Sequence, residues 1–168
     1  MRIGNKGTIS VCVLFLLFFS IQSAVVLART IPGYDGNVTV YDGAGVFGGG
    51  KAGVEEAAEG LIQRGADVRV ITVRSIGSAP NLDEYVRSLE KGYPSWRVAG
   101  VRKNNLIVFI IAKNERKTGI HYGGEWTPVL GGRWEGITTK YMNPSFKRGE
   151  FVDGFVRGIE RTTAMVDS

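Results

Sequence analysis

Cysteine and histidine are almost absent from this sequence. The chain has 168 residues but only one cysteine, Cys12, and one histidine, His121. A single cysteine excludes an intrachain disulfide, and its place in an apolar N-terminal segment leaves the rest of the chain without a thiol nucleophile. Zinc and di-metal hydrolases usually draw on several histidine ligands, which this sequence does not supply. His121 lies in an expected hairpin strand, where we predict a solvent-facing side chain.

Acidic residues are absent from the first 28 positions. Arg2 and Lys6 precede an uncharged stretch over residues 7–28, which is the layout of a secretory signal peptide. The small residue Ala28 suits cleavage, yet the stretch is also long enough to span a bilayer as an uncleaved signal anchor. Both alternatives stay open for residues 1–28, and both place the rest of the chain outside the cytoplasm. We therefore predict a secreted, periplasmic or lumenal protein, with membrane association through residues 7–28 in the second case.

A strong excess of basic residues is also missing. The formal net charge is +5, and two of these charges are Arg2 and Lys6. The other basic residues are scattered and often stand next to acidic ones, which is not the pattern of a nucleic-acid-binding surface. We expect no nucleic-acid partner.

The rest of the chain alternates between strand and helix patterns. Apolar or β-branched runs predict strands, and apolar positions at helical spacing predict helices. The expected strands cover residues 37–41, 67–75, 105–112 and 116–124, and the expected helices cover residues 51–65, 81–92, 127–142 and 150–166. This alternation predicts an α/β fold, a three-layer α/β/α sandwich around a mixed, mostly parallel sheet of about four strands. We assign residues 29–36 to a linker and residues 37–168 to one domain.

One glycine-rich stretch resembles a nucleotide-binding loop. Residues 45–51 read G-x-x-x-x-G-K, with a strand before them and a helix after them. Ala52 stands where the motif needs a Ser or Thr hydroxyl to hold Mg²⁺, and no acidic residue closes the neighbouring apolar strands. We interpret the stretch as a flexible loop between strand and helix. No nucleotide is expected.

The same region begins a series of motifs that resembles the TPM family. "VYDGAGVF" is similar to the family's V-x-D-x-A-G-V-L opening. Five further segments resemble family motifs in the same order: "GADVRVITVRSI", "LDEYVRSLEKGY", "NNLIVFIIAKNERK", "YGGE" and "MNPSFKRGEFVDGFVRGI". The resemblance covers residues 37–162. Family members are mostly extracytoplasmic or membrane-attached, in agreement with the N-terminal segment.

The resemblance implies an ion site near the end of the first strand. Carried over by motif, its ligands are Asp42, the pair Asn104 and Asn105, and Glu125. Such oxygen ligands suit Ca²⁺ or Mg²⁺. Asn104 replaces a family aspartate, so we predict weak binding. Asp42 as a turn or helix-capping residue is the competing interpretation.

Two functions follow from the resemblance. Some members are described as acid phosphatases and others bind calcium or magnesium, while many have no established activity and are linked to assembly or repair of membrane complexes. Asp42 is followed by Gly43 and Ala44, not by the second carboxylate that usually accompanies an aspartyl nucleophile. We therefore favour a membrane-associated binding or assembly module whose partner is a membrane protein complex or another extracytoplasmic protein. A divalent-metal-dependent phosphatase acting on phosphomonoesters is the alternative.

Overall fold

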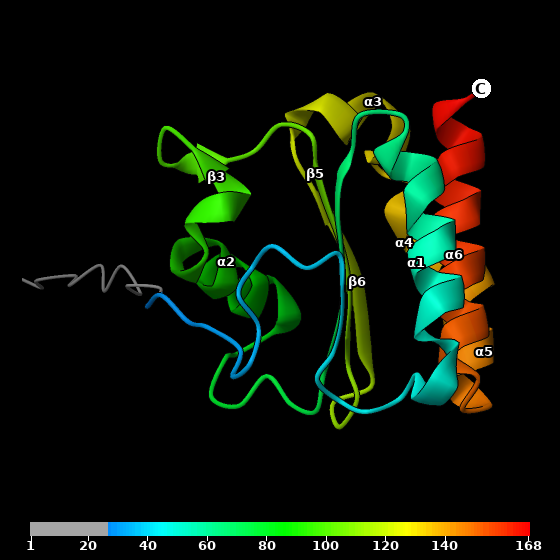
Figure 1. Cartoon of the computed structure of the whole chain (residues 1–168), viewed down its shortest axis with the longest axis horizontal. Helices are drawn as coiled ribbons and strands as arrows, with labels where there is room; N and C mark the ends of the chain where they lie inside the picture. Colours follow the sequence, from blue (N-terminus) through cyan, green and yellow to red (C-terminus); the bar gives the residue numbers. More distant parts are fainter. Residues whose placement is uncertain (1–26) are drawn as a thin grey trace, which may run out of the picture.

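The chain folds into three layers. The computed structural model describes residues 27–168, so the segment predicted to be a signal peptide or anchor lies almost entirely outside the described residues. A four-stranded sheet has helix α2 (Leu82–Gly92) on one face and helices α1 (Lys51–Ile62) and α6 (Phe151–Val166) on the other (Figure 1). The predicted α/β/α sandwich is confirmed. Between residues 27 and 168, no helix is long and apolar enough to cross a membrane.

The sheet is mixed and mostly parallel, as predicted. Its strands lie in the order β1, β2, β5, β6, with bounds Val40–Asp42, Asp67–Val73, Leu106–Ala112 and Lys117–Tyr122. β1, β2 and β5 run parallel, and β6 returns antiparallel to β5. All seven residues of β5 are buried, because this central strand is covered on both faces, and its sequence is accordingly one apolar run. We call the end where the parallel strands finish the carboxyl end of the sheet, and the other the amino end.

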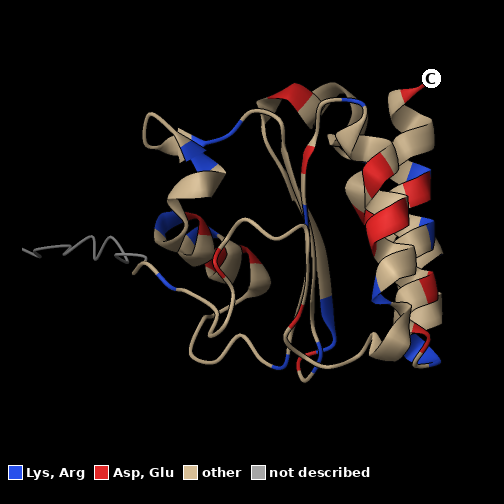
Figure 2. Cartoon of the chain, in the orientation of Figure 1, with Lys and Arg blue, Asp and Glu red and all other residues tan. Residues whose placement is uncertain are grey.

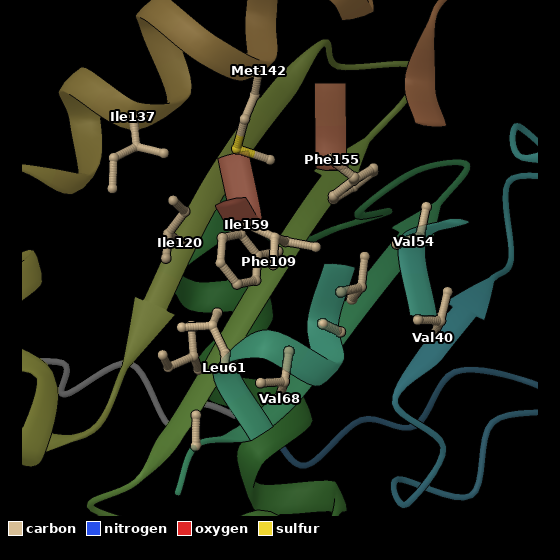
Figure 3. Packing of buried hydrophobic residues seen from close by; sticks show 14 of the residues in the cluster. Val40, Val54, Leu61, Val68, Phe109, Ile120, Ile137, Met142, Phe155 and Ile159 are labelled. Atoms are coloured by element: carbon tan, nitrogen blue, oxygen red, sulfur yellow. The ribbon is translucent and has the colours of Figure 1, made fainter. Parts of the chain in front are cut away.

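Successive side chains of β5 point to opposite faces and build two cores. Phe109 packs with residues of α1, α6 and the neighbouring strands in the larger core, which Figure 3 shows together with Leu61 and Ile159. Val108 points the other way, into a second core with Leu89 of α2.

The local signals at the helix ends behave as the sequence indicates. The side chain of Asn81 caps α2, accepting a hydrogen bond from the Glu84 amide at 2.8 Å.

The expected long helix over residues 127–142 is interrupted, because Gly131 and Gly132 turn the chain. Short helices follow one another there: α3 (Thr127–Leu130), α4 (Trp134–Ile137), a π-helical turn (Thr138–Met142) and α5 (Asn143–Lys147).

Residues 29–36, which we assigned to a linker from the sequence, pack against the rest of the domain. Ile31 and Tyr34 are buried in the core beneath α2. The Arg29 amide donates to the Ser88 carbonyl at 2.9 Å, and the Arg29 guanidinium donates to the Ile76 carbonyl at 2.9 Å. The segment contributes, together with α2, to the core on this face of the sheet. The packed domain therefore begins directly after the segment predicted to be cleaved or to span a membrane.

Candidate functional site

The sheet topology separates the four predicted ion ligands. Asp42 is the last residue of β1, at the carboxyl end, whereas Asn104 and Asn105 precede β5 at the amino end. Because β1 and β5 run in the same direction, the length of β5 lies between them, about 20 Å at the rise of a strand. The four residues therefore do not surround one ion.

Three of the four residues do lie together at the amino end. The Glu125 amide donates to the Asn104 carbonyl at 3.1 Å, and the Asn105 side chain donates to the Gly65 carbonyl at 2.9 Å. Lys103, next to this turn, binds Asp67 at 3.0 Å. The group thus offers one carboxylate, from Glu125, beside a cationic side chain, which is a poor donor set for Ca²⁺ or Mg²⁺.

Asp42 organises the loop that follows β1. Its Oδ1 accepts hydrogen bonds from the Thr72 hydroxyl at 2.6 Å and the Val46 amide at 2.9 Å, and its Oδ2 accepts one from the Phe47 amide at 2.8 Å. Burial by itself raises the pKa of the Asp42 carboxyl, but these hydrogen bonds outweigh it and hold the pKa below its ordinary value. The interpretation of Asp42 as a turn residue therefore has a direct geometric basis, while within residues 27–168 no side chain caps the helical turn or helix α1 that follow.

This arrangement also accounts for the glycine loop. In nucleotide-binding loops, backbone amides surround the phosphates, whereas here the amides of Val46 and Phe47 donate to the carboxylate of Asp42. Lys51 is the first residue of α1 and lies 3.2 Å from Glu55 one turn later. The Asp42 carboxylate thus occupies the loop amides that would bind phosphate in a nucleotide-binding loop.

The surroundings of Asp42 do not supply the full set of oxygen ligands that a tightly bound divalent cation needs. Ca²⁺ takes six to eight oxygen ligands, usually including several carboxylates. In the described part of the chain, no group of three or more histidine, cysteine, aspartate or glutamate side chains is placed to hold a metal ion. Asp42 has three of its roughly four acceptor positions occupied by donors from its own loop and from β2.

His121 is largely covered by other residues, which corrects the prediction of a solvent-facing side chain. Its side chain is 11% exposed, with Nδ1 at 3.8 Å from the Asp83 carboxylate and Nε2 without a hydrogen-bond partner among the described residues. The cause is helix α2, which covers this face of β6. Burial lowers the pKa of His121 to about 4, and the Asp83 carboxylate acts in the opposite direction. His121 is neutral at physiological pH and stands apart from Asp42.

The carboxyl end of the sheet also holds a cleft that the motif reading missed. It has a volume of about 660 Å³ and lies between the β5–β6 turn and the segment from α5 to the start of α6. Three basic side chains line it, Lys113, Arg116 and Lys147. Ligand sites in open α/β sheets favour this end. This rule, if it is applied to the residues that follow the expected strand 105–112, indicates Lys113. Lys147 joins the site only through tertiary structure.

Comparisons with known proteins agree with this architecture. A sequence profile of the TPM domain matches residues 40–165. The solution NMR structure of the N-terminal domain of a P. gingivalis protein is similar in fold, with a TM-score of 0.63 at 22% identity, covering 79% of this chain and 84% of that one. A search of curated proteins finds no match. With the profile extending from the first strand nearly to the end of the last helix, the chain belongs to the TPM domain family.

Proposed function

We propose that this protein is an extracytoplasmic binding module that serves the assembly or repair of a membrane protein complex. The observation that carries the proposal is the state of Asp42, the one carboxylate that the family motif places at the end of the first strand. Three hydrogen bonds commit it to holding a loop. A carboxylate used in this way stabilises structure and is not poised to attack a substrate.

The phosphatase alternative has little support in the arrangement of side chains. Phosphomonoester hydrolysis needs a nucleophile or a metal-bound water, together with a group that protonates the leaving oxygen. His121, the single histidine of the sequence, is a residue of β6 that faces Asp83 of α2. Family membership is then the argument for phosphatase activity, and one family can host several functions.

The attachment of residue 29 supports a place next to the membrane. Arg29 is fixed to the α2 layer by backbone and side-chain hydrogen bonds, so the packed domain extends at least to this residue. If residues 7–28 are retained as an anchor, the α2 layer lies close to the bilayer and the opposite layer faces away from it. The carboxyl end of the sheet is then open to neighbouring proteins.

The test combines capture with an activity assay. The full chain, carrying a C-terminal tag, is cross-linked in its own membranes and purified after detergent extraction, and the same protein is incubated with a generic phosphomonoester and Mg²⁺ or Ca²⁺. We expect a defined membrane protein in the cross-linked fraction and phosphate release at background. Turnover that is lost in Asp42→Asn, with unchanged circular dichroism, would replace the module by a phosphatase.

Binding of Ca²⁺ or Mg²⁺ stays a prediction, now divided between two weak sites. Each end of the sheet offers one of the predicted carboxylates, Asp42 or Glu125. A ligand that binds only the folded state raises its stability by mass action, so thermal melts with millimolar Ca²⁺ measure the effect. A shift lost in Asp42→Asn assigns the ion to the carboxyl end, and a shift lost in Glu125→Gln assigns it to the amino end.

A further inference from the structure

The cleft at the carboxyl end of the sheet has an unusual distribution of charge. Lys113 and Arg116 come from the β5–β6 turn, and Lys147 comes from the end of α5. Figure 2 shows basic positions on both of these elements, which meet at the same end of the sheet (Figures 1 and 2). The remaining polar side chains of the lining are two amides and a hydroxyl, those of Asn114, Asn143 and Thr118. No acidic residue of the described chain lines the hollow. We refer to this hollow as the basic cleft.

The acidic residues nearest in sequence to the basic cleft are engaged elsewhere. Glu115 accepts hydrogen bonds from the Ser75 hydroxyl at 2.5 Å and the Ile76 amide at 3.3 Å. Glu150 binds Arg148 at 2.6 Å. Across residues 27–168, no salt bridge involves any of the three basic side chains of the cleft. Their charges are therefore available to a ligand.

The floor of the basic cleft is apolar and aromatic. Phe146 and Phe151 stack with ring centroids 5.6 Å apart, and both are half-buried. Ile111, at the end of β5, lies beside them. An apolar group entering the cleft would cover these rings, whereas a hydrated inorganic ion would gain nothing from them. The floor therefore favours a ligand that carries an apolar group as well as negative charge.

The size and shape of the cleft narrow the choice of ligand further. Its basic side chains are all exposed, two on the β5–β6 turn and one at the end of α5, so they do not form the converging, desolvated donors that would favour a single phosphate. The surface is concave, which does not suit contact with a flat bilayer. A cavity of about 660 Å³ instead accommodates several residues of a peptide.

We propose that the basic cleft binds an acidic segment of a partner protein. Carboxylates of the segment pair with Lys113, Arg116 and Lys147, and one of its apolar side chains lies on the rings of Phe146 and Phe151. This assignment rests on the proposed function as a binding module, because it names the chemistry of the surface that the partner contacts.

The backbone at Arg116 provides a clean way to remove one of these charges. Arg116 has φ 53°, in the left-handed region that glycine adopts at no steric cost. Arg116→Gly therefore deletes the charge without disturbing the turn. Arg133→Ala is the matched control, because Arg133 is exposed, carries the same charge and follows α3 at the opposite end of the sheet (Figure 1).

The experiment measures peptide binding by fluorescence anisotropy. The full chain in detergent is titrated against a labelled peptide of Asp and Glu with a central Phe, and against the same peptide with Lys at every acidic position. We expect binding of the acidic peptide alone, weakened by added salt. Arg116→Gly and Lys147→Ala should each reduce affinity about 2–5-fold, the range of an exposed ion pair, while Arg133→Ala leaves it unchanged.

Several outcomes would overturn the assignment. An equal loss in Arg133→Ala means that net charge alone attracts the peptide. Displacement by inorganic phosphate at matched ionic strength means a site for a small oxyanion, and Arg116-dependent binding of anionic vesicles without peptide binding means a lipid surface. The double variant with Arg116→Gly and Lys147→Ala is also tested by cross-linking. If it captures the same membrane partner as the native chain, the basic cleft is excluded as the partner's binding site, while the proposal of a binding module survives.

Discussion

Lowering the pH from 7 to 5 should destabilise this protein through His121. The unfolded side chain titrates near 6.5, whereas burial under α2 lowers the pKa of folded His121 to about 4. Between these two values the unfolded chain binds a proton that the folded protein does not, so the free energy of unfolding decreases as the pH falls below 6.5. The sequence has no second histidine, and most carboxylates titrate at lower pH.

The size of the effect follows from the two pKa values. Proton linkage gives a loss of about 2 kcal/mol at pH 5 relative to pH 7, rising to about 3 kcal/mol when both states are protonated. Asp83 opposes the effect, but its side chain is 68% exposed and its carboxylate is 3.8 Å from Nδ1, so solvent screens the interaction. Arg102 and Arg87 act in the opposite direction, against the imidazolium.

Urea unfolding at pH 7, 6 and 5 is the assay, with His121→Phe as the perturbation. Phenylalanine removes both the titrating group and the unpartnered Nε2, so the variant should lose most of the pH dependence in this range. Asp83→Asn is the control and should make the native slope slightly steeper. The reasoning is refuted if the native protein and His121→Phe show the same slope, or if an NMR titration of the imidazole gives a pKa above 6.

Three other substitutions test separate parts of the structure. Thr72→Val removes the hydroxyl that donates to Asp42, and it should cost about 1–2 kcal/mol in thermal or urea unfolding and raise the Asp42 pKa in an NMR titration; an unchanged pKa would contradict the role of these hydrogen bonds in holding Asp42 ionised. Gly158→Ala places a Cβ 2.5 Å from Cγ of Met142, so calorimetry should show a loss of about 1–3 kcal/mol, and a neutral result would mean that the methionine moves aside easily. Lys51→Ala should change stability by less than about 0.5 kcal/mol, since its ion pair is exposed, and equilibrium dialysis should detect no nucleotide binding before or after the change.

Local sequence patterns determined much of the architecture. The apolar run of β5 predicted a central strand, because a strand covered on both faces has no polar side. Asn81 and Glu84 predicted the start of α2 through a contact three residues apart. The alternation of strands and helices predicted the layers, and the order of the motifs from Val40 onward identified the family. Each of these signals arises within a short segment, so the sequence contains it directly.

Tertiary structure alone decided which of the singled-out residues meet. Asp42 and Asn105 follow and precede strands that run in the same direction, and this direction puts the length of β5 between them. Helix α2 covers His121, and the alternating pattern of β6 does not predict this contact. Arg116 and Lys147 line the same basic cleft although they are 31 positions apart in the sequence. Strand direction and helix placement depend on burying both faces of the sheet at once, and no local segment carries that information.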